Sequence, residues 1–209
     1  AKLKVATPAQ REVIGAFEAA AAASHPPVAA QYGLVRAYLG ARRLADADRA
    51  MVELRKQHAV SAMIDGLEGD LRVAHGDAAG AARIFHDARA RFPQSRRLLY
   101  GELEALVDAG RPADALAEAK SELRTTAGDA TLWELRARAE AAVGKRLAQH
   151  RSLAELYAIR GNYAAAAEQL TLAQGAGDGD FFEQSAVDSR LREIRALLAE
   201  QLREQRGQH

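Results

Sequence analysis

Small and apolar side chains recur along this chain with a period of thirty-four residues. Three consecutive windows of that length begin at Val28, Ala62 and Arg96. Each window holds two segments with helical spacing of apolar residues, and the turn between them is Gly76 in the second window and Gly110 in the third. A period of this length is typical of helix pairs that bury their apolar faces by stacking. The pattern therefore predicts an all-α solenoid.

The second window indicates how the two helices of a pair can approach each other. Gly69 and Ala81 stand at its eighth and twentieth positions, where small side chains let helices cross closely. Phe85 stands at the twenty-fourth position and fills the space beside them. Gly76 suits the positive φ that ends a helix tightly, whereas the first window has Arg42 at that place.

Two capping boxes predict where helices begin. Thr7 and Gln10 flank a proline, and this box predicts a helix over Pro8–Ala23. Asp180 and Glu183 form a second box, which opens a long capping helix at about residues 181–205. This helix should cover the last open face of the solenoid with the stripe Phe182, Val187, Leu191, Ile194, Leu198 and Leu202. About eleven helices are expected in total.

One interval between turn glycines is half as long as the others, because Gly144 and Gly161 are seventeen residues apart. We expect Leu147–Arg160 to be one helix that packs in two successive hairpins, with a change of helix direction there and His150 near the junction. The predicted organisation is a single repeat domain over residues 1–209, excised from a longer protein. Its repeats cover about 28–61, 62–95, 96–129, an irregular 130–146, and 147–180.

Composition and charge limit the classes of function. The chain has 29 basic and 28 acidic residues spread along its length, which argues against a dedicated nucleic-acid surface. It has no cysteine, so disulfides and thiol chemistry are excluded. No apolar run approaches the roughly 18 residues of a membrane span.

The sequence shows no catalytic or metal-binding constellation. The six histidines lack the paired spacing of a zinc site on one helix face, and no HExxH occurs. His150, beside apolar residues, is interpreted as structural. Asp178 and Asp180 are too few for a calcium loop, so they are interpreted as a turn and a helix cap. We therefore expect no catalytic residue, no cofactor and no metal in this chain.

The segment GDAAGAARIFHDARARFP (Gly76–Pro93) resembles the second helix of the tetratricopeptide repeat. That resemblance implies a right-handed solenoid whose first helices line a concave binding face. The positions of this sequence that match the family's groove positions are Tyr32, Arg36, Met63, Asp70, Arg97, Tyr100, Glu104, Asp108, Glu134, Arg138, Arg151 and Glu155. Such a mixture of charges with tyrosines suits protein surfaces or extended peptides, although several of these residues can equally pair with one another. The lysine-and-asparagine set that clamps a terminal carboxylate in chaperone-tail-binding relatives is missing.

A narrower resemblance rests on AQHRSLAELYAIRGNYAAAAEQLTLAQ (Ala148–Gln174) and FFEQSAVDSRLREI (Phe181–Ile194). These segments resemble the C-terminal repeat domain of bacterial periplasmic zinc metalloproteases of the β-barrel assembly-enhancing type. The resemblance implies a periplasmic accessory domain that positions partners for a zinc protease domain outside this chain. Its implied partners are that protease domain and the outer-membrane β-barrel assembly machinery. The alternative hypothesis is a stand-alone cytoplasmic adaptor or co-chaperone, and a third, that the chain is itself an enzyme, has little support.

Overall fold

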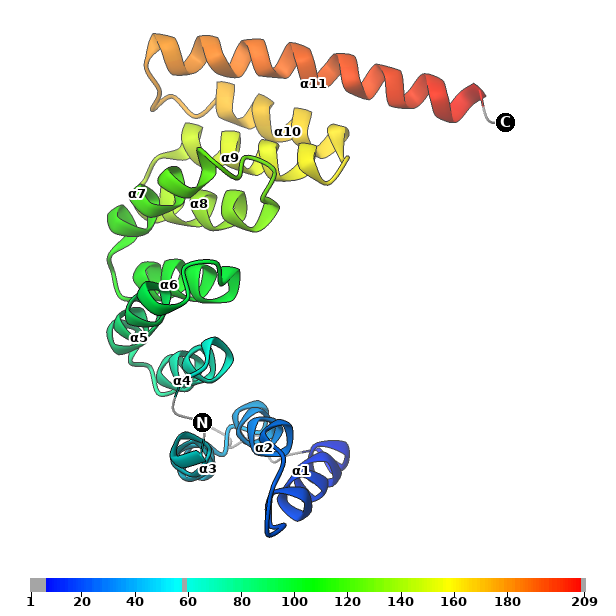
Figure 1. Cartoon of the computed structure of the whole chain (residues 1–209). Coiled ribbons are helices and arrows are strands. Elements are labelled where there is room, and N and C mark those ends of the chain that lie inside the picture. Colours follow the sequence, from blue (N-terminus) through cyan, green and yellow to red (C-terminus); the bar gives the residue numbers. More distant parts are fainter. Residues whose placement is uncertain (1–6, 58–59, 208–209) are drawn as a thin grey trace. The chain divides into compact units, whose positions relative to one another are not determined.

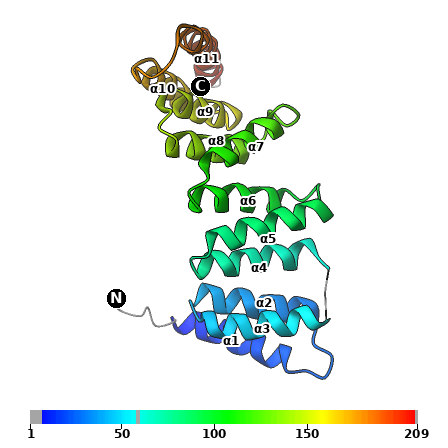
Figure 2. The ribbon, with the colours of Figure 1, turned by 90° about the vertical axis from the view of Figure 1, so that its left-hand side faces the viewer.

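The computed structural model describes residues 7–57 and 60–207, and all regular secondary structure within them is helical (Figure 1, and Figure 2 in a view turned by 90°). The helices are α1 (Pro8–Ala21), α2 (Val28–Gly40), α3 (Leu44–Gln57), α4 (Ala62–Ala74), α5 (Ala78–Arg91), α6 (Arg96–Asp108), α7 (Pro112–Leu123), α8 (Ala130–Ala142), α9 (Arg146–Ile159), α10 (Tyr163–Gln174) and α11 (Phe181–Gly207). The all-α prediction of about eleven helices is confirmed. The chain divides into two compact units, residues 1–105 and 106–209, with the boundary inside α6.

The turns within the helix pairs adopt the predicted left-handed backbone. Gly76, Gly110 and Gly144 have φ values of 80°, 74° and 76°. Arg42, in the place of the missing glycine, has a φ of 57° and is the one non-glycine residue with positive φ in the described part of the chain. A side chain disfavours this conformation because its Cβ approaches the following carbonyl oxygen. The repeat therefore imposes the same turn at Arg42, although a positive φ costs free energy at a residue with a side chain.

A phenylalanine ring fills the close crossing of each of two helix pairs. In unit 1 an added Cβ on Gly69 of α4 would overlap the ring of Phe85 from α5, and one on Gly33 of α2 would overlap the ring of Phe17 from α1. Ala81 is fully buried at the same crossing as Gly69. The predicted small positions Gly69 and Ala81 therefore lie where α4 and α5 pack directly on each other.

The first unit places two charged groups in its interior. Asp65 of α4 is fully buried, with its carboxylate 2.6 Å from Nη2 of Arg55 in α3 and 2.9 Å from Nη2 of Arg91 in α5. Glu102 of α6 is also buried, and Arg89 of α5 donates to it over 2.7 Å. A buried carboxylate can stay ionised when an opposite charge pairs with it. These ion pairs therefore connect α3, α4, α5 and α6 around two buried carboxylates.

The second unit is organised around α9, which packs against both α8 and α10 as predicted for the half-length interval. Glu140 of α8 is fully buried and accepts from Ser152 of α9 over 2.6 Å and from Arg136 over 2.8 Å. His150 of α9 lies 2.9 Å from the side-chain oxygen of Gln169 in α10. The helix thus contacts its neighbours on two sides.

The terminal helix covers α10 with only the middle of its predicted stripe. Val187, Leu191 and Ile194 are buried in a core shared with α10, whereas Phe182 is 79% exposed and Leu202 is 44% exposed. The prediction that Phe182 and Leu202 pack in this core is wrong. The reason is length, because α11 has 27 residues, about 40 Å at 1.5 Å per residue, whereas α10 has 12 residues (Figure 1). Both ends of α11 therefore extend past its partner.

Both predicted capping boxes form. Thr7 accepts from the backbone of Gln10 over 3.2 Å and Gln10 accepts from the backbone of Thr7 over 2.8 Å. Asp180 and Glu183 make the same reciprocal pair at the start of α11. The helix after Thr7 ends at Ala21, slightly before the predicted Ala23.

The loop before α11 also contains Asp178, and the sequence did not indicate the role of this carboxylate. Asp178 caps α9, because its oxygens accept from the backbone N–H of Arg146 over 2.6 Å and of Leu147 over 2.9 Å. These hydrogen bonds lower the pKa of Asp178, and the one from Leu147 has the largest effect.

Within residues 7–57 and 60–207, no helix combines the length and apolarity that crossing a bilayer requires.

Candidate functional site

The first helices of unit 1 are connected by ion pairs along their solvent-facing side. Nη1 of Arg36 in α2 lies 3.2 Å from Oδ2 of Asp70 in α4, and Arg97 of α6 contacts Oδ1 of the same carboxylate. Arg36 and Asp70 occupy the same place in successive thirty-four-residue windows. Stacked repeats bring such equivalent positions side by side. The structure therefore joins three of the predicted groove residues in one row, which we call the first-helix row.

Other predicted groove residues extend the same helix faces. Met63 precedes Asp70 by seven residues, two turns of α4, so the two side chains share a face, and Met63 is 64% exposed. Arg97 also lies over the ring of Phe85, with 5.6 Å between its Cζ and the ring centroid. Tyr100 and Tyr32 are half-buried, and Tyr32 packs against the core of unit 1. The faces thus mix exposed charge with partly exposed apolar surface.

On α6 the predicted residues follow one helical face. Arg97, Tyr100, Glu104 and Asp108 are separated by three or four residues, which is the spacing of neighbours along one side of a helix. Glu104 is exposed. At the end of α6, Asp108 accepts a hydrogen bond from Nη2 of Arg138 in α8, within unit 2. A second ion pair between predicted groove residues therefore joins successive first helices.

Two predicted residues in unit 2, Glu134 and Glu155, have structural partners instead. Glu134 lies 3.3 Å from Nη2 of Arg160, at the end of α9. Glu155 accepts from Arg190 of α11 over 2.9 and 2.7 Å, and these hydrogen bonds raise the pKa of Arg190. Arg151 is half-buried on α9. Glu155 therefore anchors the terminal helix, because a bidentate arginine–carboxylate pair has both its charges engaged.

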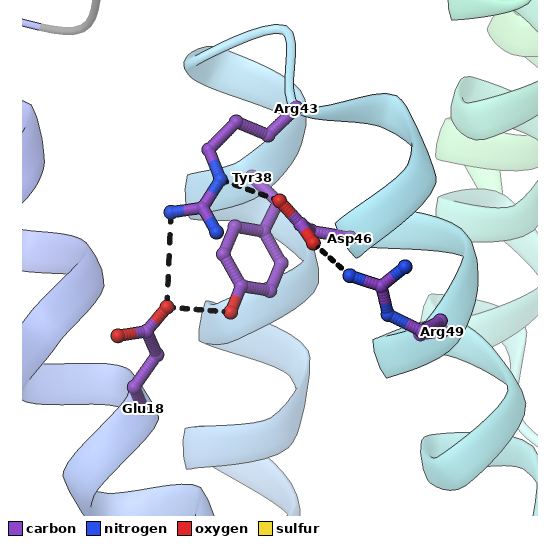
Figure 3. A network of polar contacts seen from close by, with 5 residues as sticks. All are labelled: Glu18, Tyr38, Arg43, Asp46 and Arg49. Atoms are coloured by element: carbon purple, nitrogen blue, oxygen red, sulfur yellow. Dashed lines mark hydrogen bonds and ion pairs between the residues drawn. The ribbon is translucent and has the colours of Figure 1, made fainter.

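The structure also reveals a polar network that sequence reasoning missed, between α1, α2 and α3 of unit 1 (Figure 3). The hydroxyl of Tyr38 donates to Glu18 over 2.7 Å, and Arg43 lies over the tyrosine ring with its Cζ 4.6 Å from the centroid. Arg43 also donates to Asp46 over 2.5 Å, and Arg49 contacts the other oxygen of that carboxylate. Burial, followed by the hydrogen bond to Glu18, raises the pKa of Tyr38 to about 12.

Sequence alone gave no signal for this network. Glu18 and Tyr38 are twenty residues apart and lie on different helices, so no local spacing relates them. Tyr38 is buried in the core of unit 1, and the partner of its hydroxyl depends on where α1 docks. In the part of the chain that the structure describes, no three His, Cys, Asp or Glu side chains are grouped to hold a metal ion.

The comparisons with known proteins support the fold. A tetratricopeptide repeat protein from Parabacteroides merdae is structurally similar, with a TM-score of 0.59 over 90% of this chain and 77% of that one. The two sequences are 13% identical, so the similarity concerns the fold alone. No family model matches the sequence. A search of curated proteins finds no significant match either. The predicted tetratricopeptide fold is therefore confirmed by structure rather than by sequence.

Proposed function

We propose that this chain is a protein-binding module and that its first-helix row is part of the surface that meets the partner. The observation that carries the proposal is the pairing of Arg36 and Arg97 with Asp70 across three successive first helices. The side chains of both arginines are about half exposed. Exposed ion pairs contribute about 0–1 kcal/mol to stability, so a partner can replace one member at small cost.

Apolar surface beside the charges supports the same proposal. Met63 shares the α4 face with Asp70, and Tyr100 follows Arg97 on α6. Methionine adapts to differently shaped partners, and tyrosine and arginine are enriched where binding energy concentrates. An extended peptide or the surface of a folded protein would bury these side chains and satisfy the charges around them.

Site-specific photocrosslinking tests this assignment. A benzophenone amino acid replaces Met63 on the first helix α4 or, as matched control, Val52 on the second helix α3, which is 55% exposed. Crosslinked partners from the source organism's extract are identified by mass spectrometry. We expect a discrete partner at position 63 that unlabelled protein competes away. The same partner captured equally well at position 52 would contradict the proposed surface.

We further propose that the module serves a periplasmic zinc metalloprotease that acts in outer-membrane protein quality control. The support is the resemblance of Ala148–Gln174 and Phe181–Ile194 to the repeat domain of that protease type. On this proposal the partners include the β-barrel assembly machinery and the protease domain, and zinc is bound outside this chain. Reading the coding sequence upstream tests it, because an HExxH motif behind a signal peptide is expected. A start codon directly before Ala1 would instead favour the cytoplasmic adaptor.

A further inference from the structure

Three helices of unit 1 line an open cavity that the first-helix row does not use. The cavity lies between α1, α2 and α3 and has a volume of about 340 Å³. Much of its wall is apolar and is formed by Ala21 of α1, the C-cap residue Ala22, Leu34 of α2 and Ala50 of α3. A cavity of this size can receive a side chain or a small ligand. Its apolar wall favours an alkyl group.

One wall residue presents an acceptor without a donor. Gln31 of α2 is only 6% exposed, and its Oε1 has no hydrogen-bond partner in the described structure. A buried polar atom left unpaired costs about 1–3 kcal/mol, so such atoms are uncommon in native proteins. The donor that Gln31 lacks can be supplied by a group that enters the cavity beside it.

The charged residues around the cavity indicate the charge of the group that would enter it. Glu18, Asp46 and Glu53 line it, against the single guanidinium of Arg49. Asp46 is engaged by Arg43 and by Arg49. The side chains of Glu18 and Glu53 are 44% and 61% exposed. One oxygen of Glu18 accepts from Tyr38 and lies 3.7 Å from Nη1 of Arg43, and Glu53 pairs with the exposed Lys56. Among the residues that line the cavity, three are carboxylates and one is a cation, and this composition favours a cationic guest.

We propose that this cavity is a second binding site, which receives a lysine or arginine side chain from an extended segment of a partner polypeptide. Both side chains combine an alkyl stem with a cationic head that carries several N–H donors. The stem would lie along the alanine and leucine wall, and the head would meet Gln31 and the carboxylates of Glu18 and Glu53. The site is independent of the first-helix row, because Arg36 follows Gln31 by five residues and so points about 140° away around α2.

Nuclear magnetic resonance of alanine and leucine methyl groups tests the proposal with defined probes. The intact chain is titrated with Nα-acetyl-lysine N-methylamide, with its arginine counterpart, and with the norleucine counterpart, which has an alkyl side chain but no ammonium. Free n-pentylamine is a fourth probe, which separates a peptide-borne cation from a small amine. We expect saturable shifts at Ala21, Ala22, Leu34 and Ala50 with lysine or arginine, and about tenfold weaker binding of norleucine and pentylamine.

Variants assign the binding to the proposed groups. Gln31→Leu removes the unpaired acceptor, and Glu18→Gln removes a charge while keeping an acceptor for Tyr38. Each should weaken the lysine probe about tenfold, whereas Glu12→Gln, an exposed change on the same helix α1, should leave it unchanged. Methyl spectra of the free variants report whether each folds normally.

Several outcomes would overturn the proposal. Equal affinity for norleucine would show that charge plays no part, and tighter binding of pentylamine would favour a free amine over a polypeptide. If a normally folded Gln31→Leu protein binds the lysine probe as well as the unaltered chain does, Oε1 of Gln31 does not contribute to binding. Absence of any shift at the four methyl groups would mean that the cavity holds only water. None of these results affects the crosslinking test at Met63.

Discussion

Arg36 and Asp70 stand thirty-four residues apart at the same position of two repeats, and their side chains meet at 3.2 Å between Nη1 and Oδ2. Asp70 also meets Arg97, so one carboxylate serves two cations on the solvent side. Asp65, five residues earlier on the same helix, likewise meets two arginines, but in the interior. The two aspartates of α4 therefore have similar partners and opposite surroundings, which gives them different roles.

The first prediction compares these two aspartates. Asp65→Asn should lower the free energy of unfolding by about 1–3 kcal/mol, because the buried side chain loses its charge-assisted contacts with Arg55 and Arg91. Asp70→Asn should change it by less than about 1 kcal/mol, because its pairs are largely solvated. Urea denaturation monitored by circular dichroism measures both. Equal effects would mean that Asp65 is not the interior tie described above.

The second prediction concerns the turn at Arg42. Arg42→Gly should raise the free energy of unfolding by about 0.5–1 kcal/mol, because glycine adopts a φ of 57° without the penalty of a Cβ. Gly76→Ala, the reverse change at the equivalent turn, should lower it by about 1 kcal/mol. Thermal melts of the two variants decide the matter, and a destabilised Arg42→Gly protein would show that the arginine side chain outweighs its backbone cost.

The third prediction compares the same change, glycine to alanine, at one position in each of two helices. Gly69→Ala should destabilise the protein by about 1–3 kcal/mol, because its new Cβ would overlap the ring of Phe85. Gly15→Ala in α1 should instead stabilise it by about 0.5–1 kcal/mol, since no atom lies within 4 Å of the added group and alanine favours helix. Denaturant midpoints measure both signs. Stabilisation at both positions would mean that Phe85 moves aside freely.

The fourth prediction is a dependence on pH at Asp178. Its pKa is lowered in the folded state, so its contribution to stability is complete above its unfolded value of about 3.9 and disappears as pH falls through the folded value. The difference in unfolding free energy between the unaltered chain and Asp178→Asn should be constant near neutral pH and shrink below about pH 4. Glu12→Gln, which replaces another exposed carboxylate by its amide, is the control measured under the same conditions. A difference that grows in acid would contradict the assigned sign.

Much of the fold could be predicted from the sequence, because its signals are local. Helix spacing, the capping boxes at Thr7 and Asp180, and the turn at Gly76 each depend on a few adjacent residues. The repeat period then fixes which positions of successive windows become neighbours. For that reason the left-handed turn at Arg42 could be located even though its residue type argues against it.

The candidate site was only partly predictable, because its details depend on how separate helices dock. The groove positions identified Arg36, Asp70 and Arg97 but did not show that they pair with one another. Glu155 satisfied the same positional rule and instead holds α11 through Arg190. Residues far apart in sequence, on helices with independent spacing, carry no mutual signal in a single chain.

Calorimetric titration tests the central claim, that the first-helix row binds the partner, most directly. The segment crosslinked at Met63 is titrated into the unaltered chain, into the double variant Arg97→Ala with Tyr100→Ala, and into Arg83→Ala, an exposed change on the second helix α5. We predict that the double variant binds at least about tenfold more weakly with helicity and Tm nearly unchanged, while Arg83→Ala binds normally. Unaltered binding by the folded double variant would contradict the claim.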